Sequence, residues 1–312
     1  MISPEVQYDA VLKDNRASSS WPARHIEART KWKNQKIPLS MSAFEKVQLA
    51  RHASRPTGLD YILALSPDFI ELHGDRLYRD DPSVIGGIGT FENQAITYIA
   101  LQKGRSTEDN IYRNFAMAHP EGYRKALRLM KQAEKFNRPI VTFIDTPGAY
   151  PGIGAEERGQ AEAIATNLMA MSQLRVPILS IIIGEGGSGG ALALAVANEV
   201  HMMEHAIYSV LSPEGFASIL WKDASKAKQA AELMRLTAQD LKSLEIIEHV
   251  YDEPLEGAHS YPFIVFDEVA FGMSSFLQKY MKKSPNYLLE QRYNKYRKIG
   301  IFEHVPPTRS TL

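Results

Sequence analysis

Cysteine is missing from all 312 residues of the chain. Because thiolate sulfur is required for disulfides, Cys-ligated zinc sites and iron–sulfur clusters, the chain can form none of these by itself. A thiolate nucleophile is excluded for the same reason. Any nucleophilic or metal chemistry of this chain must therefore use other groups.

An excess of charge of one sign is also missing. The chain has 36 Lys and Arg against 36 Asp and Glu, so its formal net charge is zero. Nucleic-acid binding through bulk charge is disfavoured, because a phosphate backbone attracts a basic surface. Only residues 1–40 are locally basic, and we interpret them as an N-terminal arm that is flexible or wraps around a partner.

Long hydrophobic runs are missing too. The most apolar segment, residues 176–184, is much shorter than the roughly 20 residues of a membrane-spanning helix. The N-terminus lacks the apolar segment of a secretory signal, so we expect a cytoplasmic protein without membrane contact. A hydrophobic content of 44% nevertheless excludes disorder along the whole chain. A chain of this length can bury the core of one large domain or of two domains of roughly 150 residues each.

Turn signals and apolar periodicity divide the chain into three parts. After the arm, residues 41–260 are expected to form the main domain, and residues 261–312 a C-terminal helical extension. In the main domain, residues 84–91 and 95–100 alternate like the strands of a hairpin. We therefore expect an α/β fold.

A long helix is predicted to begin at Pro120, where a missing N–H costs nothing. We expect its cations, Lys125 among them, on a solvated face. A buried-type strand, a glycine-rich turn and a helix then follow one another twice, which predicts parallel strands with right-handed crossovers. The helix after the first turn is predicted to begin near Glu156 and to bury Ala161, Ile164, Ala165 and Leu168.

The second glycine-rich turn, residues 184–190, is the most informative segment, because five of its seven residues are glycine. Glycine leaves no side chain between a peptide N–H and a ligand, and the first N–H groups of a helix have no intrahelical acceptor. Such a turn suits a phosphate or an oxyanion that develops in a transition state. Residues 148–154, after the neighbouring strand, would form another wall of the same cleft.

The residues alone leave three interpretations of this turn. Gly184-x-Gly186-x-x-Gly189 matches the dinucleotide fingerprint, but its acidic partner is poorly placed, with Glu199 and Glu204 as the nearby candidates. Gly186-x-Ser188-x-Gly190 matches the nucleophile elbow of an α/β-hydrolase serine esterase, although the predicted strand ends before Glu185. Partners for a Ser188 nucleophile would come from Asp223, Asp240, Asp252, His249 and His259, with His73 and Gly74 in an oxyanion loop. The third interpretation is an oxyanion hole of backbone N–H groups near Gly190 and Ala191.

Several runs resemble one known family, the α subunit of bacterial acetyl-CoA carboxylase carboxyltransferase. The resemblance extends from about residue 44 to residue 259. It is carried by the runs Lys103-Gly104-Arg105, His119-Pro120-Glu121-Gly122-Tyr123-Arg124-Lys125-Ala126, Asp145-Thr146-Pro147-Gly148-Ala149-Tyr150-Pro151-Gly152, Gly154-Ala155-Glu156-Glu157-Arg158-Gly159-Gln160, Gly184-Glu185-Gly186-Gly187-Ser188-Gly189-Gly190-Ala191 and Ser212-Pro213-Glu214-Gly215.

The resemblance implies a crotonase-like fold, a spiral of ββα units, with added N- and C-terminal helices. It implies transfer of a carboxyl group from carboxybiotin, held by a biotin carboxyl carrier protein, to acetyl-CoA. The product would be malonyl-CoA for fatty acid biosynthesis. The implied partners are a β subunit in an α2β2 heterotetramer, which mainly holds CoA and carries a structural zinc, and a biotin carboxylase; ATP binding belongs to the implied complex.

By the same resemblance, the oxyanion hole consists of the N–H groups of Gly190 and Ala191, with Gly189 as a neighbouring candidate. They would stabilise charge on the ureido oxygen of biotin, at typically about 3–4 kcal/mol per donor. A biotin nitrogen can remove the methyl proton itself, so no protein base is required. Other residues are expected to shape the turn or to line the facing wall: Gly186, Gly187, Gly148, Ala149 and Gly152.

Two further sets of residues are candidates. Lys103 and Arg105 follow a predicted strand, where they either bind the substrate carboxylate or a CoA phosphate or form structural salt bridges. His201 and His205 have the spacing of a metal pair on a helix, but they lie in a predicted strand pair, so we expect no metal there. As an alternative to catalysis, the chain would be a docking module for the biotin carrier.

Overall fold

The computed structural model describes residues 41–300, so the predicted N-terminal arm lies outside the described residues. One mixed sheet of eight strands forms the centre of the molecule. Its order is β1-β2-β3-β4-β5-β6-β8, and β7 pairs with the end of β5. The strands are β1 (Ile70–Glu71), β2 (Val84–Phe91), β3 (Gln94–Leu101), β4 (Ile140–Thr146), β5 (Ile178–Gly187), β6 (Glu199–Met203), β7 (Ile207–Ser209) and β8 (His249–Tyr251).

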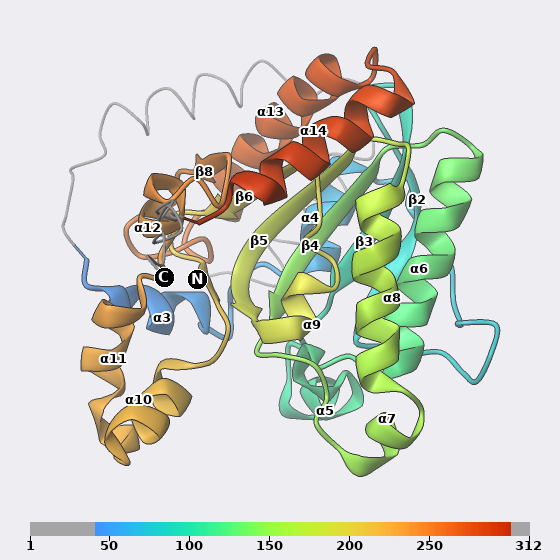
Figure 1. The fold of residues 1–312 in the computed structure, drawn as a ribbon. Coiled ribbons are helices and arrows are strands. Elements are labelled where there is room, and N and C mark those ends of the chain that lie inside the picture. Colours follow the sequence, from blue (N-terminus) through green and yellow to red (C-terminus); the bar gives the residue numbers. More distant parts are fainter. Residues whose placement is uncertain (1–40, 301–312) are drawn as a thin grey trace, which may run out of the picture.

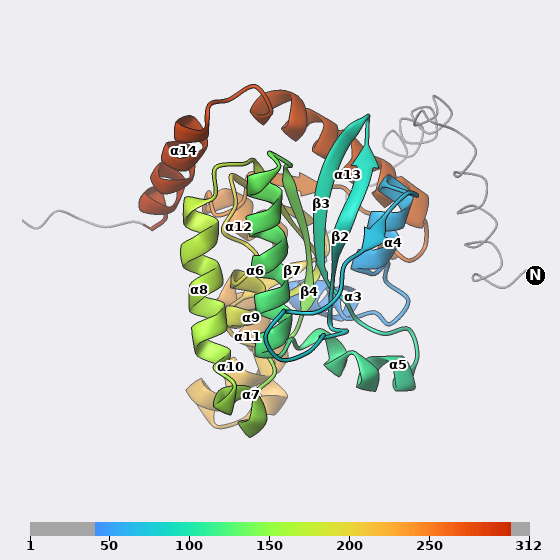
Figure 2. The same cartoon turned by 90° about the vertical axis from the view of Figure 1, so that its right-hand side faces the viewer.

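Helices cover both faces of this sheet (Figures 1 and 2). The first half of the described chain contains α3 (Ala43–Ala50), α4 (Gly58–Leu65), α5 (Thr107–Tyr112), α6 (Pro120–Lys135), α7 (Ile153–Glu157) and α8 (Gln160–Gln173). The second half contains α9 (Ser188–Leu192), α10 (Pro213–Trp221), α11 (Ala227–Met234), α12 (Ala238–Ser243), α13 (Pro262–Tyr280) and α14 (Pro285–Lys298). In Figure 2, α6 and α8 lie on one side of the sheet, and α4 and α13 lie on the other.

The core lies between the sheet and these helices. On the α4 side, buried aromatic rings connect three layers. The ring centroid of Tyr61 lies 5.4 Å from that of Phe143 and 5.0 Å from that of Phe266. Tyr61 belongs to α4, Phe143 to β4 and Phe266 to α13. The long helix α13 therefore shares the core of the central sheet.

The structure confirms the hairpin, formed by β2 and β3, and the repeated strand–turn–helix unit, in which β4 and β5 are parallel. The prediction for Lys125 was wrong. Its side chain is fully buried, and Nζ donates to Oδ1 of Asp80 at 2.6 Å and to the carbonyl of Asp81 at 2.8 Å. The segment that precedes β2 supplies acceptors that helical periodicity does not reveal.

The predicted buried stripe of the 160s helix was also wrong. The buried residues of α8 are Gln160, Ala163, Asn167 and Met171, whereas Ala161 and Ala165 are exposed. The buried side of α8 includes polar residues: Nε2 of Gln160 donates to the carbonyls of Ala118 at 2.8 Å and of Tyr150 at 3.0 Å. A search for apolar residues alone therefore selects another face of the helix.

The second predicted strand is longer than expected. β5 continues to Gly187, because β7 pairs with residues 185–187 beyond the point where the pairing with β6 stops at Ile182. The glycine-rich turn is therefore largely strand, and α9 begins directly after it. No helix in residues 41–300 has the length and apolar character to cross a bilayer.

Candidate active site

The two glycine-rich turns lie against each other at the carboxyl ends of β4 and β5. These strands are in parallel register, with Thr146 opposite Gly186. A Cβ atom on Gly190 would lie 2.5 Å from the backbone nitrogen of Ala149, and one on Gly187 would overlap the carbonyl of Pro147. The structure thus brings the predicted second turn into backbone contact with the predicted facing wall, and only glycine permits this approach.

The N–H groups at the start of α9 are available for an acceptor. The N–H groups of Ser188, Gly189 and Gly190 occupy the first turn, where a helix offers no acceptor. Gly187 is the capping residue of α9, and Ala191 follows Gly190 at the end of this first turn. The arrangement can therefore hold an oxyanion.

Access to these N–H groups is uneven. Gly190 and Ala191 are buried, Gly189 and Gly148 are partly exposed, and Ser188 is exposed. The Cβ position of Gly148 faces open space, with no atom within 4 Å. The surface is therefore open beside the first turn of α9, where a ligand atom can approach.

Ser188 has the backbone of a nucleophile elbow but not its partners. Its φ of +51° and the strand that runs directly into α9 correct the expectation that the strand ends too early. The predicted histidine partners are engaged elsewhere: the ring of His259 stacks on His52 at 3.7 Å, and that of His249 lies 5.2 Å from His201. The residues proposed for a serine hydrolase are not assembled around Ser188.

The dinucleotide interpretation fails on its acidic partner. Glu199 accepts hydrogen bonds from His201, Lys279 and Tyr280 in a largely buried cluster. Glu204 accepts from the backbone N–H of Glu253. Neither carboxylate is free for a ribose hydroxyl.

The other predicted site residues divide between the turns and two ion pairs. Gly186 packs on the ring of Tyr208, and Gly152 packs on that of Tyr150. Nζ of Lys103 lies 2.7 Å from Asp145 and 3.0 Å from Glu185, whereas Arg105 pairs with Asp60. Of the two predicted cations, Lys103 lies beneath the turns and Arg105 is largely exposed.

Asp145 and Glu185 were not among the predicted site residues. Burial alone would raise the pKa of Glu185, but the charges and hydrogen bonds of Lys103 and Arg51 lower it below the ordinary value. A signal was present, because both carboxylates lie in buried strands that lead into glycine-rich turns.

The other histidine side chains make contacts within the fold. His201 contacts Glu199 at 2.8 Å and the hydroxyl of Tyr251 at 2.7 Å. Within residues 41–300, no group of three or more potential metal ligands occurs. His119 caps α6, and its ring stacks on Tyr150 at 4.2 Å.

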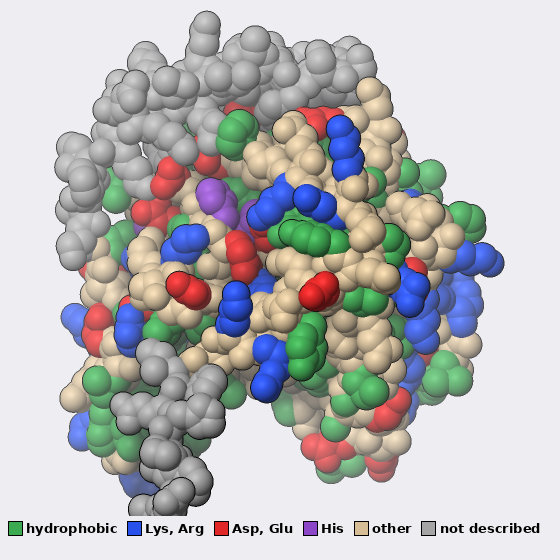
Figure 3. All heavy atoms as spheres, turned by 45° about the horizontal axis from the view of Figure 1, so that its top comes forward, with side chains coloured by type: hydrophobic (Ala, Val, Ile, Leu, Met, Phe, Trp, Pro, Cys, Tyr) green, Lys and Arg blue, Asp and Glu red, His purple; other side chains and the backbone are tan. Residues whose placement is uncertain are grey.

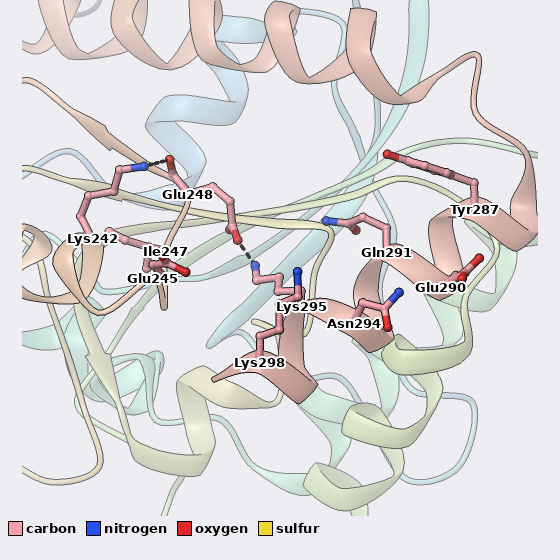
Figure 4. Close-up of a pocket in the computed structure, with 10 residues that line it drawn as sticks. All are labelled: Lys242, Glu245, Ile247, Glu248, Tyr287, Glu290, Gln291, Asn294, Lys295 and Lys298. Atoms are coloured by element: carbon pink, nitrogen blue, oxygen red, sulfur yellow. Dashed lines mark hydrogen bonds and ion pairs between the residues drawn. The ribbon is translucent and has the colours of Figure 1, made fainter. Parts of the chain in front are cut away.

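Two cavities of about 750 and 470 Å³ lie elsewhere. Figure 4 shows the larger one, whose polar lining comes from α12, α14 and the segment before β8. The smaller lies among α6, α8 and α14. Neither is lined by a residue of the two turns. At the turns, however, the apolar side chains of Ile153, in the first turn, and Leu192, in α9, are exposed.

Acidic and basic side chains are mixed over the centre of the face shown in Figure 3. Basic side chains gather along its right-hand edge.

Solved structures define the class of fold. Transcarboxylase 12S with methylmalonyl-coenzyme A and methylmalonic acid bound has a TM-score of 0.61 at 18% identity, covering 76% of this chain and 45% of that chain. A Pseudomonas malonate decarboxylase hetero-tetramer in complex with malonate has a TM-score of 0.60 at 17% identity, covering 78% and 95%. The fold is crotonase-like, as expected.

Sequence comparison defines the family. The model of acetyl co-enzyme A carboxylase carboxyltransferase-like proteins matches residues 6–300. The acetyl-coenzyme A carboxylase carboxyl transferase subunit alpha of Staphylococcus haemolyticus is 55% identical over 277 residues, covering 89% of this chain and 88% of the relative. That of Alkaliphilus oremlandii is 58% identical over 264 residues, covering 85% and 84%. The chain belongs to the acetyl-CoA carboxylase carboxyltransferase family.

Proposed function

We propose that this chain is the α subunit of an acetyl-CoA carboxylase carboxyltransferase. It transfers the carboxyl group of carboxybiotin, held by a biotin carboxyl carrier protein, to acetyl-CoA, and the product is malonyl-CoA for fatty acid biosynthesis. The observation that carries the proposal is the backbone contact between the two turns, which places the first N–H groups of α9 at the ends of two parallel strands. Family membership supplies the substrate class.

The residues at the turns fit the ureido group of biotin, because backbone N–H groups start a helix beside the open space at Gly148. The N–H groups of Gly190 and Ala191 donate to the ureido oxygen, and loss of one such donor costs about 3–4 kcal/mol of transition-state stabilisation. Gly148, Ala149 and Gly152 line the facing wall, while Gly186, Gly187 and Gly189 shape the turn. When bound, biotin supplies the carboxyl group and the nitrogen base for the methyl proton.

A second polypeptide completes this site. The exposed apolar side chains of Ile153, in the first turn, and Leu192, in α9, are suited to burial against a partner. We assign this role to a β subunit in an α2β2 heterotetramer and place the CoA site and a structural zinc in it. Biotin carboxylase, which reloads the carrier, provides the ATP binding of the complex, and the reaction takes place in the cytoplasm.

Reconstitution tests the proposal. The chain is co-expressed with the carboxyltransferase β subunit of the same cell, and malonyl-CoA formation from acetyl-CoA and carboxybiotin is measured for the pair and for each chain alone. The pair should be active and each chain alone inactive. Full activity of this chain alone, or none in a well-assembled pair, contradicts the proposal.

The docking-module alternative predicts a different result for Gly190→Val. An enzyme subunit with this substitution loses turnover but still assembles with its partner, whereas a docking module loses binding of the biotin carrier. Labelling with a fluorophosphonate tests the remaining alternative, because covalent modification of Ser188 would indicate a hydrolase.

A further inference from the structure

One ammonium group lies between two carboxylates directly beneath the paired turns. Lys103 follows β3, Asp145 is the penultimate residue of β4, and Glu185 lies in the last part of β5. Nζ of Lys103 is 2.7 Å from Oδ1 of Asp145 and 3.0 Å from Oε2 of Glu185. The exposed fractions of these three side chains are 22%, 6% and 11%. The cation therefore connects three neighbouring strands.

The carboxylates are tied to the backbone of the second turn. Oδ1 of Asp145 also accepts a hydrogen bond from the backbone N–H of Glu185 at 2.9 Å. A Cβ atom on the preceding residue, Gly184, would lie 2.5 Å from that same oxygen. Any displacement of Asp145 must therefore be followed by β5, which leads directly into the helix that contains Gly190 and Ala191.

A second cation continues the network away from the turns. Nε of Arg51 donates to Oε1 of Glu185 at 2.7 Å, and Nη1 donates to Glu214 at 2.7 Å. The network thus extends from the turns to α10, whose first turn contains Glu214.

The ammonium group is required for the charge balance of this cluster. Burial opposes the charged form of Lys103, but the nearby charges of Asp145 and Glu185 outweigh it and raise its pKa above the ordinary value. Without the cation, Glu185 would keep Arg51, but the buried carboxylate of Asp145 would lose this partner and face a second carboxylate, and an unpaired buried charge is strongly destabilising.

We propose that Lys103 is a positioning residue: by holding Asp145 and Glu185 together, it fixes the spacing of the two turns and so aims the N–H groups of Gly190 and Ala191. This inference rests on the proposed function and gives Lys103 a role other than the expected contact with substrate. Because the ammonium group is engaged by two carboxylates, it acts through the turn.

The test is Lys103→Met in the reconstituted pair, with the exposed Lys131→Met on α6 as the matched control. A misplacement of donors by a fraction of an ångström should lower kcat by about 10- to 100-fold while the KM for acetyl-CoA stays within about twofold. Lys131→Met should leave both constants unchanged. The charge-balanced double variant Lys103→Met/Asp145→Asn should have a kcat at least about fivefold higher than that of Lys103→Met.

The pH profile adds a readout that a purely structural role would not change. In Lys103→Met, Glu185 loses the nearest of the charges that lower its pKa, so that pKa should move upward and kcat should rise as the pH falls. The wild type should show no such rise. The other groups around the pair are Arg51, Arg55, Glu214 and Tyr61.

Each outcome has a distinct meaning. An inactive wild-type pair contradicts the proposed function. If the wild-type pair is active and Lys103→Met has the same kcat and KM as Lys131→Met, the positioning role is overturned. A large rise in the KM of Lys103→Met at unchanged kcat also overturns it, because it would indicate contact with substrate. If Lys103→Met does not assemble with the β subunit, Lys103→Arg is measured instead. Its kcat should stay within about fivefold of the wild-type value at unchanged KM, and a raised KM overturns the inference.

Discussion

The two ends of β5 are held in different ways. At its start, the N–H of Ile178 donates to the side chain of Asn198 at 3.1 Å, and the buried guanidinium of Arg292 donates to the carbonyls of Leu174 and Val176. At its end, cations meet carboxylates: Lys103 binds Asp145 and Glu185, and Arg55, which also donates to the carbonyl of Ile183, binds Glu253. The first end is tied by neutral acceptors, and the second by charged pairs.

We call the start of β5, near Ile178, the scaffold end, and its last part, near Glu185, the site end. Burial among neutral acceptors lowers the pKa of Arg292 to about 10, so the charged guanidinium is less stable there than in water. At the other end each cation has an opposite charge within reach, and the backbone between them continues into the glycine-rich turn. Charged hydrogen bonds are shorter and stronger than neutral ones, so they suit the end whose geometry must be held most closely.

The largest predicted effect is at the site end of β5. Gly190→Ala should lower kcat by about 100-fold or more, because the new Cβ would lie 2.5 Å from the backbone of Ala149 and must displace a donor. Gly189→Ala is the matched control, since its Cβ would meet Ile164 only at an ordinary 3.8 Å. The measurement is malonyl-CoA formation by the assembled pair. Equal losses in the two variants would show that steric contact between the turns does not control the donors.

A smaller effect, on stability alone, is expected at the scaffold end. Arg292→Met should lower the free energy of unfolding by about 2 kcal/mol, because the carbonyls of Met171, Leu174 and Val176 lose their buried donor. Urea unfolding gives this value. At a temperature where the variant is folded, kcat should equal that of the wild type. A tenfold loss of kcat would mean that the two ends are coupled.

The smallest effect concerns Glu199, the first residue of the neighbouring strand β6. Burial alone would raise its pKa, but hydrogen bonds from His201 and Lys279 lower it from an ordinary 4.5 to about 2. Because its pKa is lowered, the Glu199 carboxylate stabilises the folded state at pH values above its ordinary pKa. This stabilisation is lost as the pH falls from about 4.5 toward 2. Urea unfolding between pH 6 and 3 should show a shallower acid loss for Glu199→Gln. Identical slopes would remove Glu199 as a cause of acid sensitivity.

Much of this organisation could be predicted from the sequence. The parallel pair β4–β5 and the hairpin β2–β3 follow from local apolar patterns, which depend on residues close together in the chain. The partners of Lys103 could not be predicted in this way. Asp145 and Glu185 are 42 and 82 positions further along the chain, and only the pairing of strands brings them together.

Two errors have the same origin. The burial of Lys125 depends on acceptors from Asp80 and Asp81, about 45 residues earlier. The length of β5 depends on β7, which follows later in the chain and continues the ladder. The buried face of α8 has a related cause, because it includes polar Gln160, which donates to the carbonyls of Ala118 and Tyr150. Contacts distant in sequence therefore decide where charges lie, even when local patterns decide the elements.

The most direct measurement deletes one donor without adding or removing a side chain. Replacement of Ala191 by lactic acid changes its amide to an ester and removes only the N–H. In the assembled pair, kcat should fall by about 10²- to 10³-fold with little change in KM. The matched ester at Ala193, whose N–H donates to the carbonyl of Gly189 at 3.0 Å, should affect stability more than turnover. A kcat within threefold of wild type for the Ala191 ester would contradict the account.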